Sequence, residues 1–296
     1  MNKVAFVFPG QGSQYIGMGK DILDCAKDIV DLTNEILGFD LRKLCLEGPE
    51  AKLNLAEFAS PSILMLSYIL FSFFKEKVKP DFLAGHSLGE FTAAVCSECI
   101  SYQDGIRIVK KRAEIMQKSS KDGAMAAILG LKKDKIEEII KDEKNVEIAN
   151  INCPGQIVIS GKKYAVEKIK DKFLDAGAKK VVFLNVSVPS HSSFMEEAFY
   201  EFFLFMKDIK FNDPKIPIIT NIDAKIKSNG EDLKKALINQ MKSTILWEDC
   251  VRNLISQGVD TFFEIGPKNV LTNLIKRIDS SVKRYNIEKK DDIIKW

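Results

Sequence analysis

The pentapeptide Gly85-His86-Ser87-Leu88-Gly89 is the feature that most limits the folds open to this chain of 296 residues. It follows a short apolar run, Phe82 to Gly85, that is typical of a buried strand, and it opens a helical stretch that continues to Cys99. A G-x-S-x-G sequence between a strand and a helix is the pattern of a nucleophile elbow, a tight turn that exposes a serine hydroxyl at the edge of a parallel sheet. The pattern therefore predicts an α/β protein in which Ser87 is a nucleophile. The simpler alternative is a serine that only caps the helix.

The segments on either side of this turn alternate between short apolar runs and longer helical stretches. The first strand, Val4 to Phe8, ends at Pro9-Gly10. Such alternation is typical of a parallel sheet covered by helices on both faces. The charged tail after Ser280 is expected to pack loosely. The expected strands are 4–8, 82–85, 216–221 and 261–265, and the expected helices are 61–77, 87–99, 103–118, 247–257 and 270–278.

Between residues 123 and 189 the pattern changes. Strands and helices are predicted there in the order βαββαβ, which is the order of a ferredoxin-like unit. We therefore predict a ferredoxin-like subdomain at 123–189, inserted into a catalytic α/β domain made of residues 1–122 and 190–296. The six predicted elements are 124–129, 133–141, 146–152, 156–160, 165–176 and 180–186.

A serine needs a general base to act as a nucleophile near neutral pH, and the chain has only two histidines. His86 is the immediate neighbour of Ser87, and adjacent side chains on a tight turn usually diverge. His191, where the insertion rejoins the main domain, is therefore the predicted base. The alternative for His191 is an ordinary loop or helix-cap histidine.

An oxyanion hole requires two donors aimed at the oxygen of a tetrahedral intermediate. The backbone N–H of Leu88, directly after the nucleophile, is one expected donor. The second is expected from the loop after the first strand, where the N–H of Gln11 is the best candidate. This loop resembles a dinucleotide-binding fingerprint, but the G-x-G-x-x-G spacing fails at Tyr15, so no cofactor is predicted.

Arg112 is the one charged residue on the apolar face of its helix. At 100° per residue it projects near the middle of that face, whereas the other charged side chains of the helix lie opposite. A buried guanidinium is costly unless it meets an anion. That anion is either a buried Asp or Glu, in a structural ion pair, or the carboxylate of a substrate, held bidentately. The apolar face is formed by Ile106, Ile108, Val109, Ala113, Ile115 and Met116.

Composition excludes several classes of function. The formal net charge of +3 gives no electrostatic support for nucleic-acid binding. The six cysteines are scattered, and the single C-x-x-C at Cys96 and Cys99 lies in an apolar helical run, so buried thiols are expected rather than a metal or redox site. No signal peptide is recognisable, and the longest apolar stretch, 61–74, is shorter than a membrane span. We expect a cytoplasmic protein without a membrane partner.

Taken together, these segments resemble the malonyl-CoA:acyl carrier protein transacylases, and the resemblance runs in order from residue 3 to about residue 280. It implies a hydrolase-like α/β domain with a ferredoxin-like insertion. It also implies that Ser87 is acylated, that His191 is the base, and that Arg112 binds the malonyl carboxylate. Gln11 and Leu88 would supply the oxyanion-hole amides, and the backbone carbonyl of Gln240 would orient the histidine. The segments that carry the resemblance are Phe8–Gln14, Gly85–Glu90, Arg112, Val188–His191 and Glu264–Pro267.

The chain departs from the family pattern at two places. The usual Gly-Pro-Gly-Lys is replaced by Gly266-Pro267-Lys268-Asn269, and Asn269 is expected to take the positive φ of the lost glycine. The stretch before Trp247 usually contains Asn-Pro and here is Lys242–Leu246. The second departure affects the expected loop near Gln240 but not the catalytic pair.

The implied reaction is a ping-pong transfer without a cofactor or metal. The malonyl group passes from malonyl-CoA to Ser87 and then to the phosphopantetheine thiol of holo acyl carrier protein, for fatty-acid synthesis. The carrier is expected to be acidic and to meet basic residues, for which the candidates are Lys179, Lys180, Lys276 and Arg277. The alternatives are a trans-acting polyketide acyltransferase, a serine thioesterase or esterase that uses water, and a non-catalytic carrier-binding module.

Overall fold

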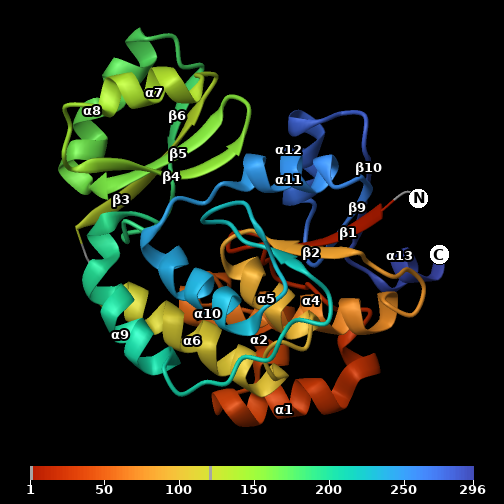
Figure 1. Cartoon of the computed structure of the whole chain (residues 1–296). Coiled ribbons are helices and arrows are strands. Elements are labelled where there is room, and N and C mark those ends of the chain that lie inside the picture. Colours follow the sequence, from red (N-terminus) through yellow and green to blue (C-terminus); the bar gives the residue numbers. More distant parts are fainter. Residues whose placement is uncertain (1–2, 120–121) are drawn as a thin grey trace.

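The computed structural model describes residues 3–119 and 122–296 and contains two β-sheets (Figure 1). The larger sheet has the strand order β10-β9-β1-β2-β7-β8. All neighbouring strands in it are parallel except β7 and β8, so the predicted parallel sheet is confirmed. The strand expected at 216–221 is only two residues long. The strands are β1 (Lys3–Phe8), β2 (Phe82–Gly85), β7 (Ile218–Ile219), β8 (Ile226–Lys227), β9 (Val259–Ile265) and β10 (Lys283–Ile287).

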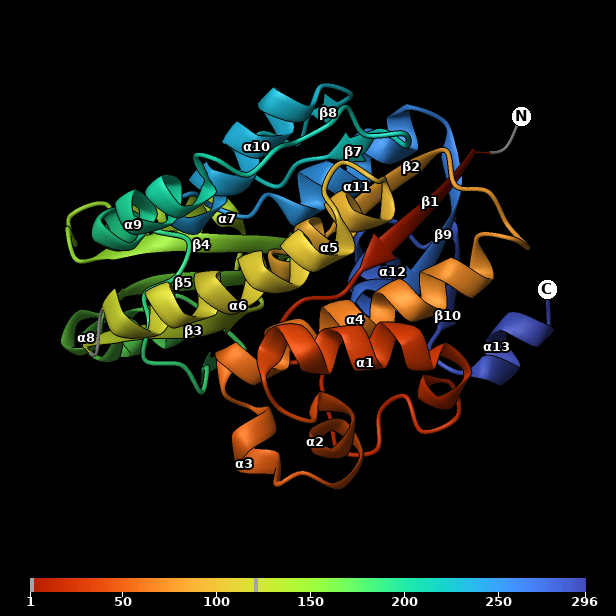
Figure 2. The same cartoon turned by 90° about the horizontal axis from the view of Figure 1, so that it is seen from below.

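Helices cover both faces of this sheet because successive side chains of each strand point to opposite sides. Phe6 and Phe8 of β1 pack into the core that includes α4, α5 and α6, while Ala5 and Val7 pack against α11 and α12. Figure 2 shows α4, α5, α6 and α1 together on one side of β1 and β2. The helices of the main unit are α1 (Lys27–Leu37), α2 (Leu41–Glu47), α3 (Glu50–Leu53), α4 (Ala56–Phe74), α5 (Leu88–Cys96), α6 (Tyr102–Ser119), α9 (Glu196–Met206), α10 (Gly230–Asn239), α11 (Trp247–Ser256), α12 (Val270–Ile278) and α13 (Lys290–Ile294).

Helix α4 is longer than the sequence pattern predicted, because it begins at Ala56 and includes Pro61 in its second turn. With 19 residues, its length and composition would allow it to cross a membrane, so the expectation that this stretch is too short is wrong. However, 72% of its apolar window is buried inside the structure. That burial is typical of the central helix of a packed core, here between β1 and α6.

The second sheet is antiparallel, with the order β4-β5-β3-β6. Its elements follow one another as βαββαβ, as predicted, with α7 (Lys133–Ile140) and α8 (Lys163–Asp175) packed on the sheet. The division of the chain at 122/123 and 189/190 stays a prediction, and residues 1, 2, 120 and 121 of the predicted main domain lie outside the described residues. The strands are β3 (Gly123–Leu129), β4 (Val146–Cys153), β5 (Gln156–Lys162) and β6 (Lys180–Phe183).

Several contacts tie this sheet to the main unit, among them a backbone pairing and an arginine contact. Ile245, just before α11, exchanges backbone hydrogen bonds with β4, because its N–H donates to Ala149 O and its carbonyl accepts from the Ile151 N–H, both at 2.8 Å. From α12, the Arg277 guanidinium donates to Gln156 Oε1 and to Pro154 O in the turn between β4 and β5. The two sheets therefore flank a common junction.

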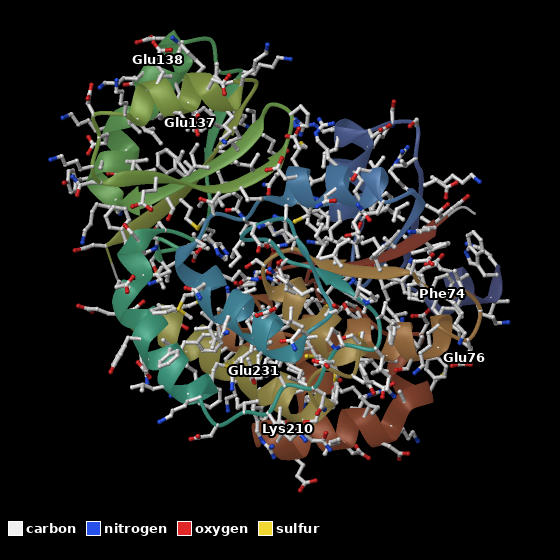
Figure 3. All side chains as sticks on the ribbon, in the orientation of Figure 1. Phe74, Glu76, Glu137, Glu138, Lys210 and Glu231 are labelled. Atoms are coloured by element: carbon white, nitrogen blue, oxygen red, sulfur yellow. The ribbon has the colours of Figure 1, made fainter. Side chains whose placement is uncertain are left out.

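The tail after Ser280 is well packed, so the expectation of loose packing is wrong. Strand β10 pairs in parallel with β9 along five residues, and α13 follows it. The ring of Trp296 lies 4.9 Å from that of Phe263 and 6.3 Å from that of Phe74, measured between centroids. Figure 3 shows Phe74 beside this C-terminal segment. The charged residues of the tail lie on β10, on α13 and in the turn between them, while Ile287, Ile293 and Trp296 face the core, so composition alone did not reveal this packing.

Candidate active site

The backbone at Ser87 has the strained geometry that the elbow pattern predicts. Ser87 joins β2 to α5 with φ 50° and ψ −104°, a conformation that non-glycine residues rarely adopt. The flanking glycines are required by close backbone contacts. A Cβ on Gly85 would lie 1.9 Å from the carbonyl carbon of Gly89, and a Cβ on Gly89 would lie 2.0 Å from Phe8 O. The start of α5 therefore packs directly against the ends of β1 and β2.

Asn221 holds this turn from the neighbouring strand. Its Oδ1 accepts from the Ser87 N–H at 2.8 Å, and its Nδ2 donates to Gly85 O at 2.8 Å. These two bonds offset part of the strain at Ser87. Asn221 was not among the predicted site residues, although it follows β7 at the sheet edge where the carboxyl ends of parallel strands meet.

Ser87 and His191 are brought together across 104 residues of sequence. Ser87 Oγ lies 2.8 Å from His191 Nε2, and His191 Nδ1 lies 2.8 Å from the backbone carbonyl of Gln240. Because a carbonyl oxygen only accepts, Nδ1 carries the proton and Nε2 presents its lone pair to the serine. His191 itself has φ 61°, and its N–H is bonded to Met241 O. The altered segment 242–246 thus leaves the Gln240 carbonyl within reach of the histidine.

The environment of His191 favours its neutral form. Burial, and after it the positive charge of Arg112, lower the pKa of His191 to about 3, although the bond to Gln240 acts in the opposite direction. His86, in contrast, points away from Ser87, with Nε2 2.8 Å from Asn152 Oδ1. His191 is therefore the histidine placed to accept a proton from Ser87.

Arg112 lies beside this pair and is 4% exposed. Its Nη2 donates to Gln240 Oε1 at 2.9 Å and is 3.5 Å from Ser87 Oγ. The guanidinium carbon lies 5.4 Å from the ring centroid of Phe91, a cation–π contact. Within residues 3–119 and 122–296 no carboxylate forms a salt bridge with Arg112, and its Nε has no hydrogen-bond partner. The structural ion pair that the sequence left open is not found there, and the guanidinium keeps donors for a ligand.

The two expected oxyanion donors lie on adjoining segments. Leu88 is the first residue of α5, so its N–H points out of the helix N-terminus, where partial positive charge gathers. The loop that holds Gln11 packs on the elbow, because a Cβ on Gly10 would lie 2.6 Å from His86 O. Over the described ranges, neither the Leu88 N–H nor the Gln11 N–H donates to a protein acceptor. Their assignment to an oxyanion hole stays a prediction.

A cavity of about 530 Å³ opens at the junction of the two sheets. Gln11, Arg112 and Met116 line it from the main unit, and Lys163 and Phe183 line it from the subdomain. This volume lies within the range of about 300–1,000 Å³ that is typical of small-molecule binding sites. Among the described residues no group of His, Cys, Asp and Glu side chains is arranged to hold a metal ion.

The turn after β9 differs from the expectation. Asn269 was predicted to take the positive φ of the missing glycine, but its φ is −134° and Lys268 has φ 62° instead. The prediction was wrong because the left-handed position falls on the third residue of the turn. The Lys268 N–H bonds Glu288 Oε1, and its ammonium bonds Gly12 O at 3.0 Å, which hold the turn in this form.

Two further side chains of the site had no predicted role. The side-chain amide of Gln240 contacts Arg112, the Ser87 carbonyl and Glu90, whereas only its backbone carbonyl was predicted to take part. Glu90 is buried on α5, and its carboxyl group is the one that the Gln240 amide contacts. Glu90 stands in the Gly85–Glu90 segment that carries the family resemblance, but no local pattern predicts the role of either side chain, because their contact joins chain segments 150 residues apart.

Comparisons with known proteins agree with this arrangement. A family model described as an acyl transferase domain matches residues 5–290. The malonyl CoA-acyl carrier protein transacylase of Staphylococcus aureus (strain MSSA476) is 38% identical over 305 residues, which cover 100% of this chain and 99% of the relative.

Solved structures show the same likeness. An acyl carrier protein S-malonyltransferase from Vibrio cholerae superposes with a TM-score of 0.96 at 36% identity, covering 99% of both chains. A malonyl-transacylase solved in complex with its holo type II polyketide acyl carrier protein superposes with a TM-score of 0.95 at 36% identity, covering 99% of this chain and 98% of that one. The chain is thus similar to malonyl transferases along its whole length.

Proposed function

Because this chain belongs to the acyl transferase domain family, we propose that it transfers a malonyl group from malonyl-CoA to the thiol of holo acyl carrier protein, through an ester on Ser87. This reaction supplies malonyl groups for fatty-acid synthesis. The observation that carries the proposal is a buried Arg112 with no carboxylate partner among the described residues, placed beside a hydrogen-bonded serine–histidine pair. A site of this kind suits an acyl group that ends in a carboxylate.

In the first half-reaction, Ser87 Oγ attacks the thioester carbon of malonyl-CoA while His191 Nε2 accepts the serine proton. The 2.8 Å separation of these atoms supports this step, and the lowered pKa of His191 keeps Nε2 unprotonated and able to accept. The tetrahedral oxyanion is held by the N–H groups of Leu88 and Gln11. The C–S bond then breaks, CoA leaves with the proton from His191, and malonyl-serine remains.

In the second half-reaction, the phosphopantetheine thiol of the carrier protein enters the same cavity. His191 accepts the thiol proton, the sulfur attacks the malonyl ester, and the proton returns to Ser87 Oγ as the C–O bond breaks. The bond from His191 Nδ1 to the Gln240 carbonyl keeps Nε2 as the acceptor in both halves. One base therefore serves two nucleophiles in turn.

Selectivity for the malonyl group follows from Arg112. The guanidinium binds the free carboxylate with two parallel hydrogen bonds, which a lysine does not reproduce. An acetyl group leaves these buried donors unpaired, and such a loss discriminates strongly between substrates.

We further propose that the protein is cytoplasmic and that its acidic carrier meets basic residues around the cavity. Lys179 and Lys180 are exposed at the start of β6, whose last residue lines the cavity. Lys276 is exposed on α12. Arg277 is engaged with Gln156 and Pro154, so it is the weakest of these four candidates.

Intact-protein mass spectrometry after mixing with malonyl-CoA tests the reaction. We expect a stable malonyl adduct, absent from Ser87→Ala, that is discharged by holo acyl carrier protein. Rapid release of free malonate without a carrier would instead identify a thioesterase or esterase.

A second test replaces Arg112 by alanine. We expect the ratio of kcat/KM for malonyl-CoA to that for acetyl-CoA to fall at least about tenfold. An unchanged ratio would contradict the role of Arg112.

The carrier itself is tested by competition. Discharge is compared for a fatty-acid carrier and a type II polyketide carrier, since one structural relative is bound to the latter kind. Faster discharge by the fatty-acid carrier is expected. Faster discharge by the polyketide carrier would favour the trans-acting polyketide alternative, which uses the same chemistry.

A further inference from the structure

Glu90 is a buried carboxylate that the transfer chemistry described above does not use. It is the third residue of α5 and is 1% exposed. Its Oε1 accepts from the Asn221 N–H at 2.9 Å, and its Oε2 accepts from Gln240 Nε2. Burying a carboxylate is costly, and no salt bridge offsets that cost within the described parts of the chain.

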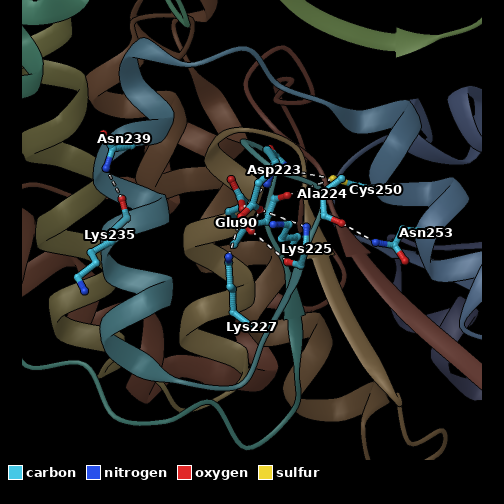
Figure 4. A network of polar contacts seen from close by, with 11 residues as sticks. Glu90, Asp223, Ala224, Lys225, Lys227, Lys235, Asn239, Cys250 and Asn253 are labelled. Atoms are coloured by element: carbon cyan, nitrogen blue, oxygen red, sulfur yellow. Dashed lines mark hydrogen bonds and ion pairs between the residues drawn. The ribbon is translucent and has the colours of Figure 1, made fainter.

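The ionisable groups that face Glu90 come from three parts of the chain. Arg112 on α6 favours its ionised form, whereas Asp223, after β7, opposes it. The Cys250 thiol of α11 also faces this network, and Figure 4 shows Glu90 together with Asp223 and Cys250. The pKa of Glu90 is raised to about 8, because the effect of burial outweighs that of the hydrogen bonds from Gln240 and Asn221. A carboxyl group in this position destabilises the fold unless its contacts are satisfied.

The side-chain amide of Gln240 has two N–H donors and one oxygen, and all three are committed. Nε2 donates to Ser87 O at 2.9 Å and to Glu90 Oε2, so Oε1 is left to accept from Arg112 Nη2 at 2.9 Å. The reversed amide would set its oxygen against the Ser87 carbonyl, would lose the N–H that Glu90 Oε2 accepts, and would set its N–H groups against those of Arg112. Ser87 O and Glu90 thus determine which end of the amide faces the arginine.

We propose that Glu90 is a positioning residue for acyl-group selection, because it fixes the Gln240 amide so that Oε1 holds the Arg112 guanidinium beside Ser87. This inference rests on the malonyl transfer proposed above. Gln240 Oε1 is the only close polar anchor of Arg112 besides Ser87 Oγ among the described residues. Without the Glu90 carboxylate, the amide is free to turn and the guanidinium loses its place opposite the substrate carboxylate.

Glu90→Gln is the direct test, because it keeps the shape of the side chain but sets an NH2 group against one of the two N–H donors. We expect the malonyl/acetyl ratio of kcat/KM to fall at least about tenfold, mainly through a higher KM for malonyl-CoA, while acetyl transfer changes only a few-fold. A purely structural role for Glu90 would lower both activities together. Gln240→Leu, which keeps the backbone carbonyl that orients His191, is expected to lower the ratio to the same extent.

The double variant shows whether Glu90 acts through Gln240. If it does, adding Glu90→Gln to Gln240→Leu lowers the ratio no further, whereas additive losses would contradict the proposal. Glu264→Gln is the matched control, since Glu264 is equally buried but bonds Leu271 and Thr272 at the start of α12, away from Ser87. It is expected to reduce thermal stability and to leave the ratio unchanged.

Thermal melting of each variant reports folding. If Glu90→Gln does not fold, an unchanged ratio in Gln240→Leu still overturns the proposal. A wild-type protein that shows no preference for malonyl-CoA would contradict the proposed function and this inference with it. A wild-type preference that survives in both variants would contradict the role of Glu90 alone.

Discussion

Single residues of the site carry unusual protonation states, and His191 shows the clearest consequence. Its ring is 5% exposed and faces the positive charge of Arg112. Both effects disfavour the imidazolium, so the free base persists at pH values at which an ordinary histidine is protonated. The bond to the Gln240 carbonyl keeps that free base in the tautomer that faces Ser87.

Acylation is therefore expected to resist mild acid. The pKa of His191 is lowered to about 3. The second-order rate constant for acylation of Ser87 by malonyl-CoA, measured in single-turnover experiments, should therefore stay nearly constant between pH 7.5 and pH 5. A base with the ordinary pKa of 6.5 would lose about 30-fold by pH 5. A break near pH 6.5, in protein shown by melting curves to be folded, would contradict the lowered value.

The same pKa shift has an opposite meaning for stability. Below pH 6.5 the unfolded chain takes up a proton at His191 that the folded chain does not, so the free energy of unfolding falls as pH drops toward the folded pKa. Glu90 behaves in the reverse sense, because its raised pKa of about 8 lets the folded chain hold a proton that the unfolded chain releases above about pH 4.5. The contribution of Glu90 therefore falls as pH rises from about 4.5 to about 8.

Among the elements, the turn from β2 into α5 is the one that tolerates least change. Gly89→Ala would place a Cβ 2.0 Å from Phe8 O, which is backbone at the end of β1 and cannot move independently. We expect a loss of about 3 kcal/mol or more in the free energy of unfolding, with a matching loss of Ser87 acylation. Urea unfolding and malonyl-adduct formation measure the two effects.

Gly177→Ala is the matched control for this substitution. Gly177 has φ +96° but has open space at its Cβ position, so alanine there adds backbone strain without a clash. The expected cost is about 1–2 kcal/mol, with acylation unchanged. Equal effects of the two substitutions would show that the contact with Phe8 does not determine the elbow.

The C-terminal segment is a second element whose packing is testable. Trp296 contacts the rings of Phe74, Phe263 and Tyr285, so Trp296→Ala should lower the free energy of unfolding by about 1–2 kcal/mol. Tyr200→Ala, an aromatic residue that is 61% exposed on α9, should change it by less than about 0.5 kcal/mol. Urea denaturation compares the two, and a tail that packs loosely would give similar small values.

The sequence predicted the helices and strands whose own residues show a clear apolar run or a helical period. Strand β2 at 82–85 and helix α12 at 270–278 were predicted to the residue, because β2 is an apolar run after Pro80 and α12 is an amphipathic stretch after Pro267. Helix α9 was missed because its sequence is apolar on nearly every face, which removes the helical period. Helix α10 was missed although Asn229 caps it, accepting from the Asp232 N–H.

The residues of the candidate site also fall into two groups, those that the sequence alone identifies and those that only the fold brings together. Ser87 stands in a motif, and His191 is one of two histidines, so chemistry narrowed the choice before any fold was known. Asn221 and the Gln240 side chain have no such signal, because asparagine and glutamine are common and only the folded sheet edge brings them to Ser87. The tail after Ser280 was misjudged because its few apolar residues, such as Ile287 and Ile293, are spread among charged ones and give no clear period.

At the scale of the whole molecule, the cavity lies at the junction between the parallel sheet and the antiparallel sheet. A carrier protein must deliver its thiol into this junction while its own folded body stays outside. Contacts at the rim therefore affect the second half-reaction more than the first. Complementary charge at such a rim speeds association and is weakened by salt.

Lys179 and Lys180 are the pair to test as carrier contacts, because both are exposed at the start of β6, whose last residue, Phe183, lines the cavity. Reversing both charges with Lys179→Glu and Lys180→Glu is expected to raise KM for holo acyl carrier protein about tenfold at low salt, since opposite charges become like charges. The difference from wild type should shrink as ionic strength rises, while adduct formation from malonyl-CoA stays unchanged. Lys283→Glu is the control, because Lys283 starts β10 at the opposite end of the parallel strands from Ser87. If Lys283→Glu raises KM for the carrier as much, the net charge of the protein explains the effect, and a local contact does not. If the Lys179→Glu and Lys180→Glu variant also slows acylation by malonyl-CoA, these lysines contact CoA and not the carrier alone.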